Sequence, residues 1–430
     1  MQHMEAEGRQ QQVLERSIGT VGAVTLGLGS MLGTGLFVGI ALATDLSGTW
    51  VLAAIALAML TATCNGLSSA QLAAAYPVSG GTYEYATRLL SPATGFAAGW
   101  LFLCAKSASA AAAALGAASY LLATAGADPS EWGTMVGLLL LLALTCTVLL
   151  GIRGSVLVTM IILCLVGIGM VVYLGASMNT SPLAGTGGVP PDAVGIPGAA
   201  ALMFVAFTGY GRIATLGEEV RNPRRTIPRA IVLTIVLIGS LYLLVGWSLS
   251  QSAGPDELLL QDSSLNPLQA VTTRAWGDGA GGLVAVAAIA AMIGVLLNLL
   301  LGLSRVVLAM ARRGDVPRSH GFIWNRTSTP PWAVIDVSII IAILILVGDF
   351  TFAWRLSAFT VLIYYAITNL SALRLQPEQR FIPRWVAVTG LVLCSTLAFC
   401  IPPGTWVIGL VVLLAGFITR WLMRTLLGTA

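Results

Sequence analysis

Two glycine-rich runs interrupt apolar segments of this chain. Their residues are the ones best suited to bind a polar ligand. The first, Gly27–Gly35, holds four glycines in nine residues, and the second, Phe207–Gly211, reads FTGYG. Each glycine costs a helix about 1 kcal/mol relative to alanine and bares main-chain polar groups. In hydrocarbon such groups are tolerated only where they line a cavity or are buried in protein, so both runs predict broken membrane helices. For the first run alone, a seam of small residues between packed helices is the alternative.

An opened helix offers polar groups of two kinds. Where a half-helix begins, free amides and the positive end of the helix dipole favour an anion; where one ends, bare carbonyls suit an ammonium group. Paired interruptions in two halves of a chain are a sequence sign of a transporter binding site. The pair here predicts a site for a zwitterion, with the carboxylate at the Gly33–Gly35 amides and the amino group at carbonyls near Met31 and Val205–Thr208.

Lys106 is the only lysine and lies about ten residues into an apolar segment. A charge at such a depth costs roughly 2.5–3.5 kcal/mol and marks a functional site by default. Snorkelling to the membrane surface is the alternative, and the depth argues against it. Our hypothesis is that Lys106 is a tethered cation whose charge state couples substrate binding to a proton.

Other chemistry is excluded or disfavoured by the residues present. The two histidines, His3 and His320, lie in polar segments, and the six cysteines lie in apolar stretches without metal-ligand spacing, so we expect no metal site and no cofactor. No Ser/His/Asp set or nucleotide-binding loop occurs, which argues against an enzyme. The net charge of +4 comes from scattered residues and gives no sign of nucleic-acid binding. We also expect no covalently attached accessory subunit, because no cysteine lies in an extracellular segment.

The composition indicates which kind of structure holds the glycine-rich runs and Lys106 in place. Only 9% of the side chains are charged and 57% are hydrophobic, whereas soluble domains carry about 25% charge. The sequence predicts an all-α polytopic membrane protein with twelve spans, near 18–43, 49–74, 94–124, 133–151, 155–178, 197–217, 228–250, 280–311, 332–348, 352–373, 385–400 and 405–424.

The orientation of the chain follows from its arginines. With the polar tail 1–17 in the cytosol, seventeen arginines fall on the cytosolic side and two on the other, which satisfies the positive-inside rule with both termini cytoplasmic. We therefore expect residues 18–430 to form one domain in the lipid bilayer of the cell membrane. In a bacterium this would be the inner membrane.

Four blocks of sequence resemble the amino acid–polyamine–organocation permeases. They are GSMLGTGLFVG (29–39), YPVSGGTYEY (76–85), FVAFTGYGRIATLGEEVRNPRRTIPRAI (204–231) and SRVVLAMARRGDVP (304–317). The resemblance implies a leucine-transporter-like fold in which spans 1–5 (18–178) and spans 6–10 (197–373) are inverted repeats, spans 1 and 6 are broken, and spans 11–12 (385–424) are peripheral. It also implies alternating-access transport of amino acids or related amines.

The resemblance further assigns residues. It implies that Gly33, Thr34 and Gly35 bind the substrate carboxylate, that main-chain carbonyls of Met31, Val205 and Thr208 receive the amine, and that Phe207 is an aromatic gate. In many proton-coupled relatives a span 5 lysine replaces a structural sodium ion, but Leu165 or Val166 stands there in this chain. Candidate gate or structural residues are Glu84, Arg153, Arg212, Glu218, Glu219 and Asn298.

The expected substrate is a neutral, apolar amino acid. Spans 1, 3, 6 and 8 carry no carboxylate at mid-depth, where a cationic substrate would need one. Sodium coupling is disfavoured, because Asn298 is the only polar side chain in the middle of span 8 and sodium needs oxygen ligands. Proton-coupled symport and amino acid exchange both remain open. The alternatives are a cationic amino acid or polyamine transporter, or a channel or receptor-like binder without coupled turnover.

Overall fold

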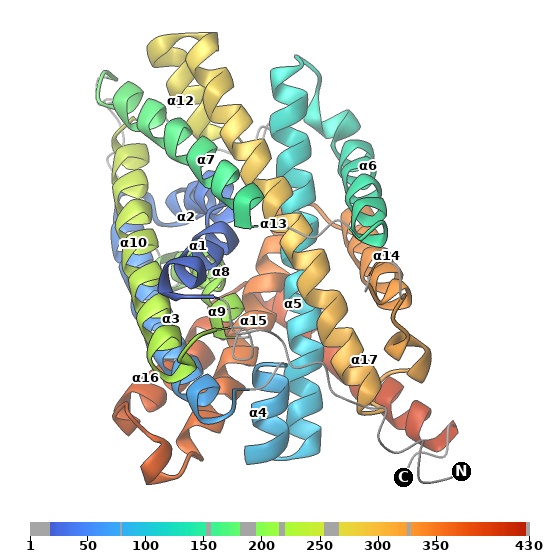
Figure 1. The fold of residues 1–430 in the computed structure, drawn as a ribbon. Coiled ribbons are helices and arrows are strands. Elements are labelled where there is room, and N and C mark those ends of the chain that lie inside the picture. Colours follow the sequence, from blue (N-terminus) through green and yellow to red (C-terminus); the bar gives the residue numbers. More distant parts are fainter. Residues whose placement is uncertain are drawn as a thin grey trace.

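The computed structural model describes residues 18–77, 80–151, 156–180, 195–214, 220–252, 266–324, 327 and 329–426. These residues form one bundle of α-helices (Figure 1), and within them no β-strand occurs, only two isolated bridges, Ile18 with Val220 and Trp324 with Thr329. The predicted all-α class is therefore confirmed for the described part of the chain.

The first half of the chain supplies seven α-helices, a π-helix and a short 3-10 turn. They are α1 (Thr20–Met31), the π-helix η1 (Gly35–Gly39), α2 (Ile40–Ser47), η2 (Gly48–Trp50), α3 (Val51–Ala75), α4 (Thr82–Leu89), α5 (Pro92–Thr124), α6 (Pro129–Leu149) and α7 (Val156–Ser177).

The second half of the chain is helical as well. Its helices are α8 (Gly195–Phe207), α9 (Tyr210–Ala214), α10 (Pro223–Ser252), α12 (Pro267–Trp276), α13 (Asp278–Arg312), η4 (Arg318–Gly321), α14 (Pro331–Val347), α15 (Phe350–Leu373), η5 (Pro377–Gln379), α16 (Arg384–Phe399) and α17 (Pro403–Leu426).

Each of the twelve predicted apolar runs overlaps helix in the structure. The runs at 18–43 and 197–217 are the two that contain a break, as the glycines predict. Helix α12 lies outside the twelve predicted runs, between the seventh and the eighth. The predicted tail 1–17 lies outside the described residues.

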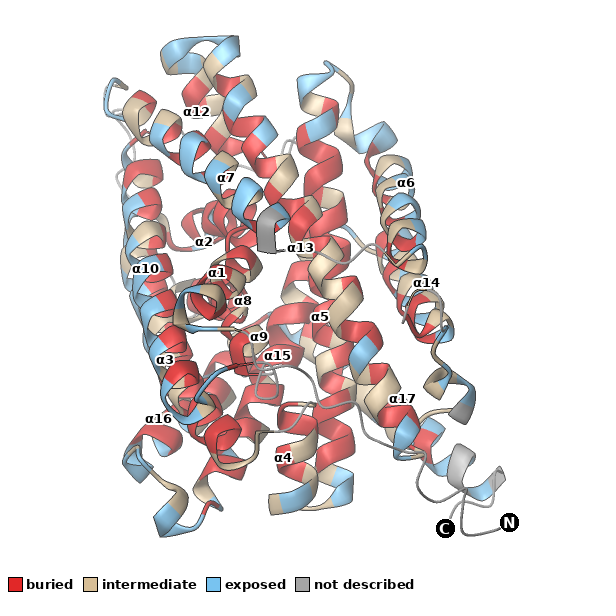
Figure 2. Cartoon of the chain, viewed as in Figure 1, coloured by how far each residue is buried: buried red, intermediate tan, exposed pale blue. Residues whose placement is uncertain are grey.

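Eight helical segments among the described residues are long and apolar enough to cross a membrane, and four shorter apolar helices accompany them. Their outward faces are apolar too, for example Val171 on α7, Leu346 on α14 and Leu414 on α17, which are 73%, 64% and 61% exposed. Figure 2 shows these outer helices with exposed residues on their outer sides. So much exposed apolar surface marks a membrane interaction, and the surrounding solvent is therefore lipid.

Helix α5 lies at the centre of the bundle (Figures 1 and 2). It starts at Pro92 behind the cap Ser91, whose hydroxyl accepts from the Thr94 amide at 3.1 Å. Its middle is built from small residues, and the run Ala110–Ala114 is fully buried. Helices α4, α6, α13, α14 and α15 all pack against α5. This helix therefore forms the scaffold on which a residue such as Lys106 is held.

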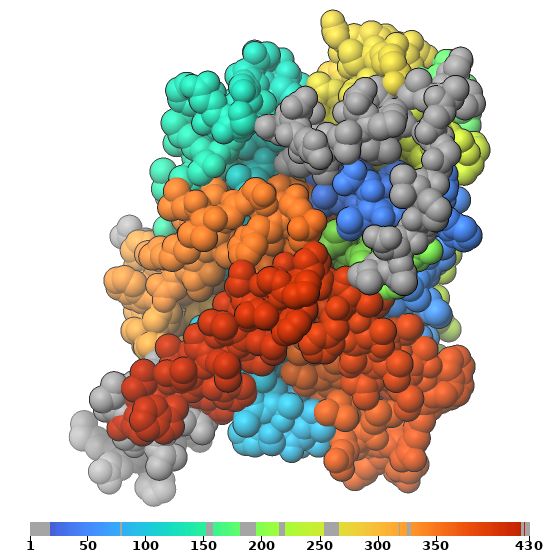
Figure 3. Space-filling model, turned by 180° about the vertical axis from the view of Figure 1, so that it is seen from behind, coloured from blue at the N-terminus to red at the C-terminus, as the bar shows by residue number. Residues whose placement is uncertain are grey.

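At the end of the bundle where α4 lies, a buried ion pair joins three segments; we call Tyr83, Asp315 and Arg420 the Asp315 cluster. Arg420 Nε on α17 donates to Asp315 Oδ1 at 2.9 Å, and the Tyr83 hydroxyl on α4 donates to Oδ2 at 2.7 Å. Burial and the neighbouring carboxylate raise the pKa of Tyr83, so its phenol stays a donor. Figure 3 shows the C-terminal helix lying diagonally across the outside of the bundle. Although α17 is on the outside, Arg420 ties it to the segment after α13.

Candidate functional site

The first break separates α1 from η1. Helix α1 ends at Met31, Leu32 is extended (φ −76°, ψ 91°), and helical backbone resumes at Thr34. The Tyr242 hydroxyl on α10 donates to the Met31 carbonyl at 2.7 Å and to the Ala206 carbonyl at 3.3 Å. The one proton of this phenol is therefore shared between main-chain carbonyls at both breaks, with the shorter bond to Met31, and it supplies a partner that an opened helix needs inside a membrane.

The second break separates α8 from α9 at Thr208 and Gly209. The Thr208 hydroxyl donates to the Val205 carbonyl at 2.7 Å, and the Thr208 amide donates to the same oxygen at 3.1 Å. A Cβ on Gly209 would lie 2.6 Å from the Ser30 carbonyl oxygen, and one on Gly35 would lie 2.3 Å from Ala206 Cβ. The two breaks are therefore in direct contact, and glycine is what permits the approach.

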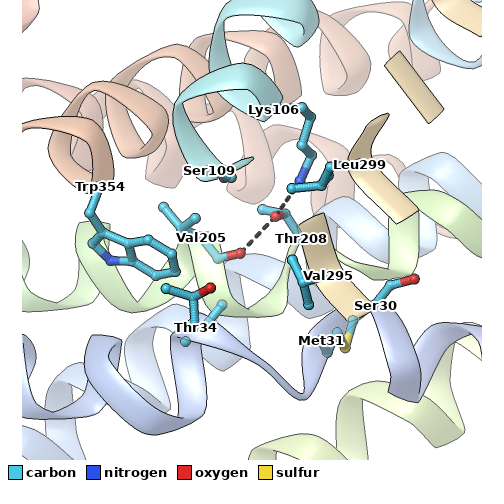
Figure 4. Close-up of a pocket in the computed structure, with 12 residues that line it drawn as sticks. Ser30, Met31, Thr34, Lys106, Ser109, Val205, Thr208, Val295, Leu299 and Trp354 are labelled. Carbon is cyan, nitrogen blue, oxygen red and sulfur yellow. Dashed lines mark hydrogen bonds between the residues drawn. The ribbon is translucent and has the colours of Figure 1, made fainter. Parts of the chain in front are cut away.

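A cavity of about 40 Å³ lies between the two breaks, with space for about three water molecules. It is lined by residues from five helices and both breaks (Figure 4): Ser30, Met31, Thr34, Gly35, Lys106, Ser109, Val205, Ala206, Thr208, Val295, Leu299 and Trp354. Polar groups line one part of it and the apolar side chains of α13 and α15 another, which suits a small amphiphilic molecule.

Lys106 reaches this cavity from α5, although 102 residues separate it from its partner. Its ammonium Nζ donates to the Thr208 hydroxyl at 2.7 Å, and Figure 4 shows the ammonium, the hydroxyl and the Val205 carbonyl in a row. The side chain is 8% exposed. None of the other residues that line the cavity is charged. The buried lysine is therefore part of the site and does not snorkel to the surface.

Thr34 adds a second polar group to the cavity. It is 3% exposed, and its hydroxyl has no hydrogen-bond partner within the described structure. Among the main-chain bonds that the described residues form outside the helices, none starts from the amides of Gly33, Thr34 or Gly35. Buried polar groups in native proteins are nearly always paired, so these donors next to the cavity can still form hydrogen bonds.

The family model for amino acid permeases matches residues 22–423, almost the entire chain. The chain belongs to the amino acid permease family. An uncharacterized transporter of Mycobacterium tuberculosis is 39% identical over 406 residues, which cover 94% of this chain and 90% of that protein. A branched-chain amino acid permease of Bacillus subtilis is 25% identical, with 90% and 87% covered. A chloroplastic cationic amino acid transporter of Arabidopsis thaliana is 26% identical, with 89% and 69% covered.

Several predicted binding residues of this permease line the cavity and two do not. Met31, Thr34, Gly35, Val205 and Thr208 are among the lining residues. Gly33 and Phe207 are not. Gly33 lies against Val295 on α13, and a Cβ added at Gly33 would lie 2.5 Å from Val295 Cγ2. The ring of Phe207 is fully buried and packs edge-on against Tyr242 at 5.1 Å between centroids.

Three predicted gate or structural residues, Glu84, Arg212 and Asn298, lie in the described part of the permease, and none of them lines the cavity. Glu84 on α4 pairs with Arg313 after α13 and, at 3.8 Å, with Arg88 one turn along its own helix. Arg212 lies half-buried on α9, and Asn298 is half-buried on α13 and is absent from the cavity lining. Arg153, Glu218 and Glu219 lie outside the described residues.

Sequence reasoning missed part of the cavity wall in this permease. Ala206 lies within the predicted range Val205–Thr208, but Ser30, Ser109, Val295, Leu299 and Trp354 were not predicted to line the cavity. Ser109 could have been found, because it lies one helical turn after Lys106 on the same face. Val295 and Leu299 are also one turn apart, but apolar residues in an apolar span give no contrast. The Trp354 indole donates to the Leu202 carbonyl at 3.2 Å, a contact that only the folded chain reveals.

Proposed function

We propose that this permease is a secondary active transporter that carries neutral, apolar amino acids across the cell membrane by alternating access. The observation that carries the proposal is the cavity between the two helix breaks, which combines main-chain polar groups with an apolar wall. Such a site can hold the charged backbone of an amino acid at the breaks. Its side chain would lie against α13 and α15 once these helices move apart, because the cavity has space for about three water molecules.

The absence of an acidic residue from the cavity lining supports a neutral substrate. A cationic side chain or a polyamine would bring an extra positive charge beside Lys106, with no carboxylate in the lining to balance it. Burying an unpaired charge is costly. The apolar wall formed by Val295, Leu299 and Trp354 favours an aliphatic side chain, in keeping with the branched-chain permease of Bacillus subtilis. The relative from Arabidopsis thaliana makes cationic amino acids the alternative to be tested.

Lys106 is our candidate for the group that couples transport to a proton. It is the only residue with a basic side chain in the cavity lining, and its bond to Thr208 links it directly to the break of α8. Gain or loss of a proton on Lys106 therefore changes the charge of the site itself. This supports proton-coupled symport, with amino acid exchange as the alternative cycle.

The proposal includes the membrane topology. The twelve helical spans would cross the bilayer with both termini in the cytoplasm, and 18–178 and 197–373 would form the two inverted repeats, with 385–424 outside them. Reporter fusions test this arrangement. A fluorescent protein fused at the C-terminus should fold and fluoresce in the cytoplasm, and alkaline phosphatase inserted before α12 (Pro267–Trp276) should be active outside. The reverse pattern would overturn the orientation.

Uptake into proteoliposomes tests the transport function. Purified protein is reconstituted, and uptake of labelled leucine, alanine, serine and arginine is measured with an imposed pH gradient, with a sodium gradient, or with unlabelled amino acid inside. We expect leucine uptake that saturates and is driven by an inward proton gradient, with protein-free liposomes as control. Arginine or spermidine that competes as strongly as leucine would contradict the neutral substrate. Flux that never saturates would indicate a channel.

A further inference from the structure

Three main-chain carbonyls beside the cavity, those of Met31, Val205 and Ala206, already have donors from the protein. The Met31 carbonyl accepts from Tyr242 at 2.7 Å, and the Ala206 carbonyl accepts from the same hydroxyl at 3.3 Å. The Val205 carbonyl accepts from both the hydroxyl and the amide of Thr208. A carbonyl has two lone pairs, so an amino group can still approach Met31 or Ala206. It gains less there than at a carbonyl with no partner.

The hydrogen-bond donors around the cavity, unlike these carbonyls, still lack some of their partners. Lys106 has three N–H donors, and one of them is accounted for by Thr208. The buried Thr34 hydroxyl has no partner in the described structure. The amides of Thr34 and Gly35, two residues that line the cavity, begin the helical segment that continues through η1 and α2 to Ser47. The cavity therefore offers an ammonium, a hydroxyl and main-chain amides as donors, whereas three of its carbonyls already have a donor, and this balance favours an anion.

Lys106 also takes the position at α8 that suits a positive charge. Through the Thr208 hydroxyl it interacts with the carbonyl end of α8, and the negative end of a helix dipole stabilises a cation. Of the elements around it, α1, α8, α13 and α15 contribute no acid, arginine or histidine to the cavity lining. The Tyr365 hydroxyl on α15 also contacts Thr208, because it donates to the Thr208 carbonyl at 3.5 Å. A buried ammonium without an acidic neighbour calls for an anion from the ligand.

We propose that the cavity recognises its ligand through the carboxylate, with Lys106 as the counter-ion, and that the α-amino group is dispensable. Monocarboxylates that lack an amino group, such as 2-oxo acids with an aliphatic side chain, are then ligands of this permease. This inference rests on the proposed substrate site and extends its substrate class. The protein's own lysine supplies at α8 the positive charge that a substrate amine would otherwise bring.

Three molecules with the same side chain distinguish the contribution of the carboxylate from that of the amino group. Leucine carries both charges, 4-methyl-2-oxopentanoate keeps only the carboxylate, and 3-methylbutylamine keeps only the amine. We expect the 2-oxo acid to inhibit leucine uptake within about tenfold of unlabelled leucine, since it keeps the charge-assisted hydrogen bonds. The amine should not inhibit at a concentration about a hundred times higher. Inhibition by the amine and none by the 2-oxo acid would overturn the inference while leaving amino acid transport in place.

Two variants of neighbouring residues test the role of the ammonium. Lys106→Met keeps an unbranched side chain one atom shorter than lysine and removes the charge, and we expect inhibition by the 2-oxo acid to weaken at least about tenfold. Ser107→Ala is the matched control, because Ser107 is the next residue on α5, is buried, and has an unpartnered hydroxyl outside the cavity lining. It should behave as the unmodified protein. Equal effects of the two substitutions would indicate a general disturbance of α5 and contradict the inference.

Binding measured without transport separates this inference from the proposed function. The thermal unfolding midpoint of the purified protein in detergent should rise with 4-methyl-2-oxopentanoate and stay constant with 3-methylbutylamine, because only a ligand of the folded state stabilises it. This rise should be lost in Lys106→Met. If leucine is not transported but the 2-oxo acid binds, the transport proposal fails and the carboxylate site stands. If neither leucine nor the 2-oxo acid raises the midpoint, both are wrong.

Discussion

Replacing Asp315 by asparagine should destabilise the protein strongly, although Asp315 lies far from the cavity in the fold. The carboxylate accepts from Arg420 and Tyr83, and the side chains of Asp315 and Arg420 are 7% and 8% exposed. The guanidinium also lies 4.7 Å over the ring of Phe96. The amide would keep the shape of the carboxylate but leave the Arg420 charge buried without a counter-ion, which costs about 3–5 kcal/mol. Unfolding entropy of about 2.1 cal/mol/K per residue converts this to a fall of about 3–5 °C in the unfolding midpoint.

Tryptophan fluorescence of the detergent-purified protein during heating measures the midpoint. Glu84→Gln is the control, because the arginine partners of Glu84, Arg88 and Arg313, are 44% and 38% exposed. Solvent screens such exposed ion pairs, so each contributes only about 0–1 kcal/mol to stability. The double substitution Asp315→Asn with Arg420→Met should recover part of the loss, since it removes the unpaired charge. If Asp315→Asn unfolds at the same temperature as Glu84→Gln, burial does not govern the strength of this ion pair and our reasoning is wrong.

Three further predictions concern the breaks. Thr208→Val keeps the volume of the side chain but removes the hydroxyl that bridges Lys106 and the Val205 carbonyl. We expect the free energy of unfolding to fall by about 1–3 kcal/mol and the KM for leucine to rise, and unchanged values of both would contradict the bridge. Gly35→Ala should abolish uptake by folded, monodisperse protein, because the added Cβ meets Ala206 Cβ at 2.3 Å and Cα at 2.8 Å. Gly33→Ala meets chiefly the Val295 side chain, so Val295→Ala should restore its folding, as judged by size-exclusion chromatography; no recovery would show that backbone freedom matters at Gly33.

The helix breaks were predictable because their cause is local. Four glycines in nine residues weaken any helix, and the break falls at Leu32–Thr34, inside the predicted run. The alternative interpretation, close packing through small residues, is realised at the same place, since Gly35 and Gly209 let the two breaks touch. Both physical reasons therefore favour glycine, and the sequence could not separate them.

The neighbours of the site were harder to predict because they depend on tertiary packing. The depth of Lys106 in its span showed that it was unusual, but its partner Thr208 is 102 residues away. Trp354, Val295 and Leu299 are apolar residues in apolar spans, so nothing in the sequence distinguishes them from side chains that face lipid. Arg420 contributed only to the count of cytosolic charges, whereas the fold buries it against Asp315.

The alanine run of α5 has a consequence for the rest of the molecule. Ala110–Ala114 are fully buried on a helix that α4, α6, α13, α14, α15 and α17 contact, so a larger side chain in this stretch would have to displace a neighbouring residue. In a close-packed interior, added volume displaces the neighbouring helices. Bulky substitutions along this run should therefore be among the least tolerated in the chain, and a mutational scan would outline the central axis of the bundle without any knowledge of its ligand.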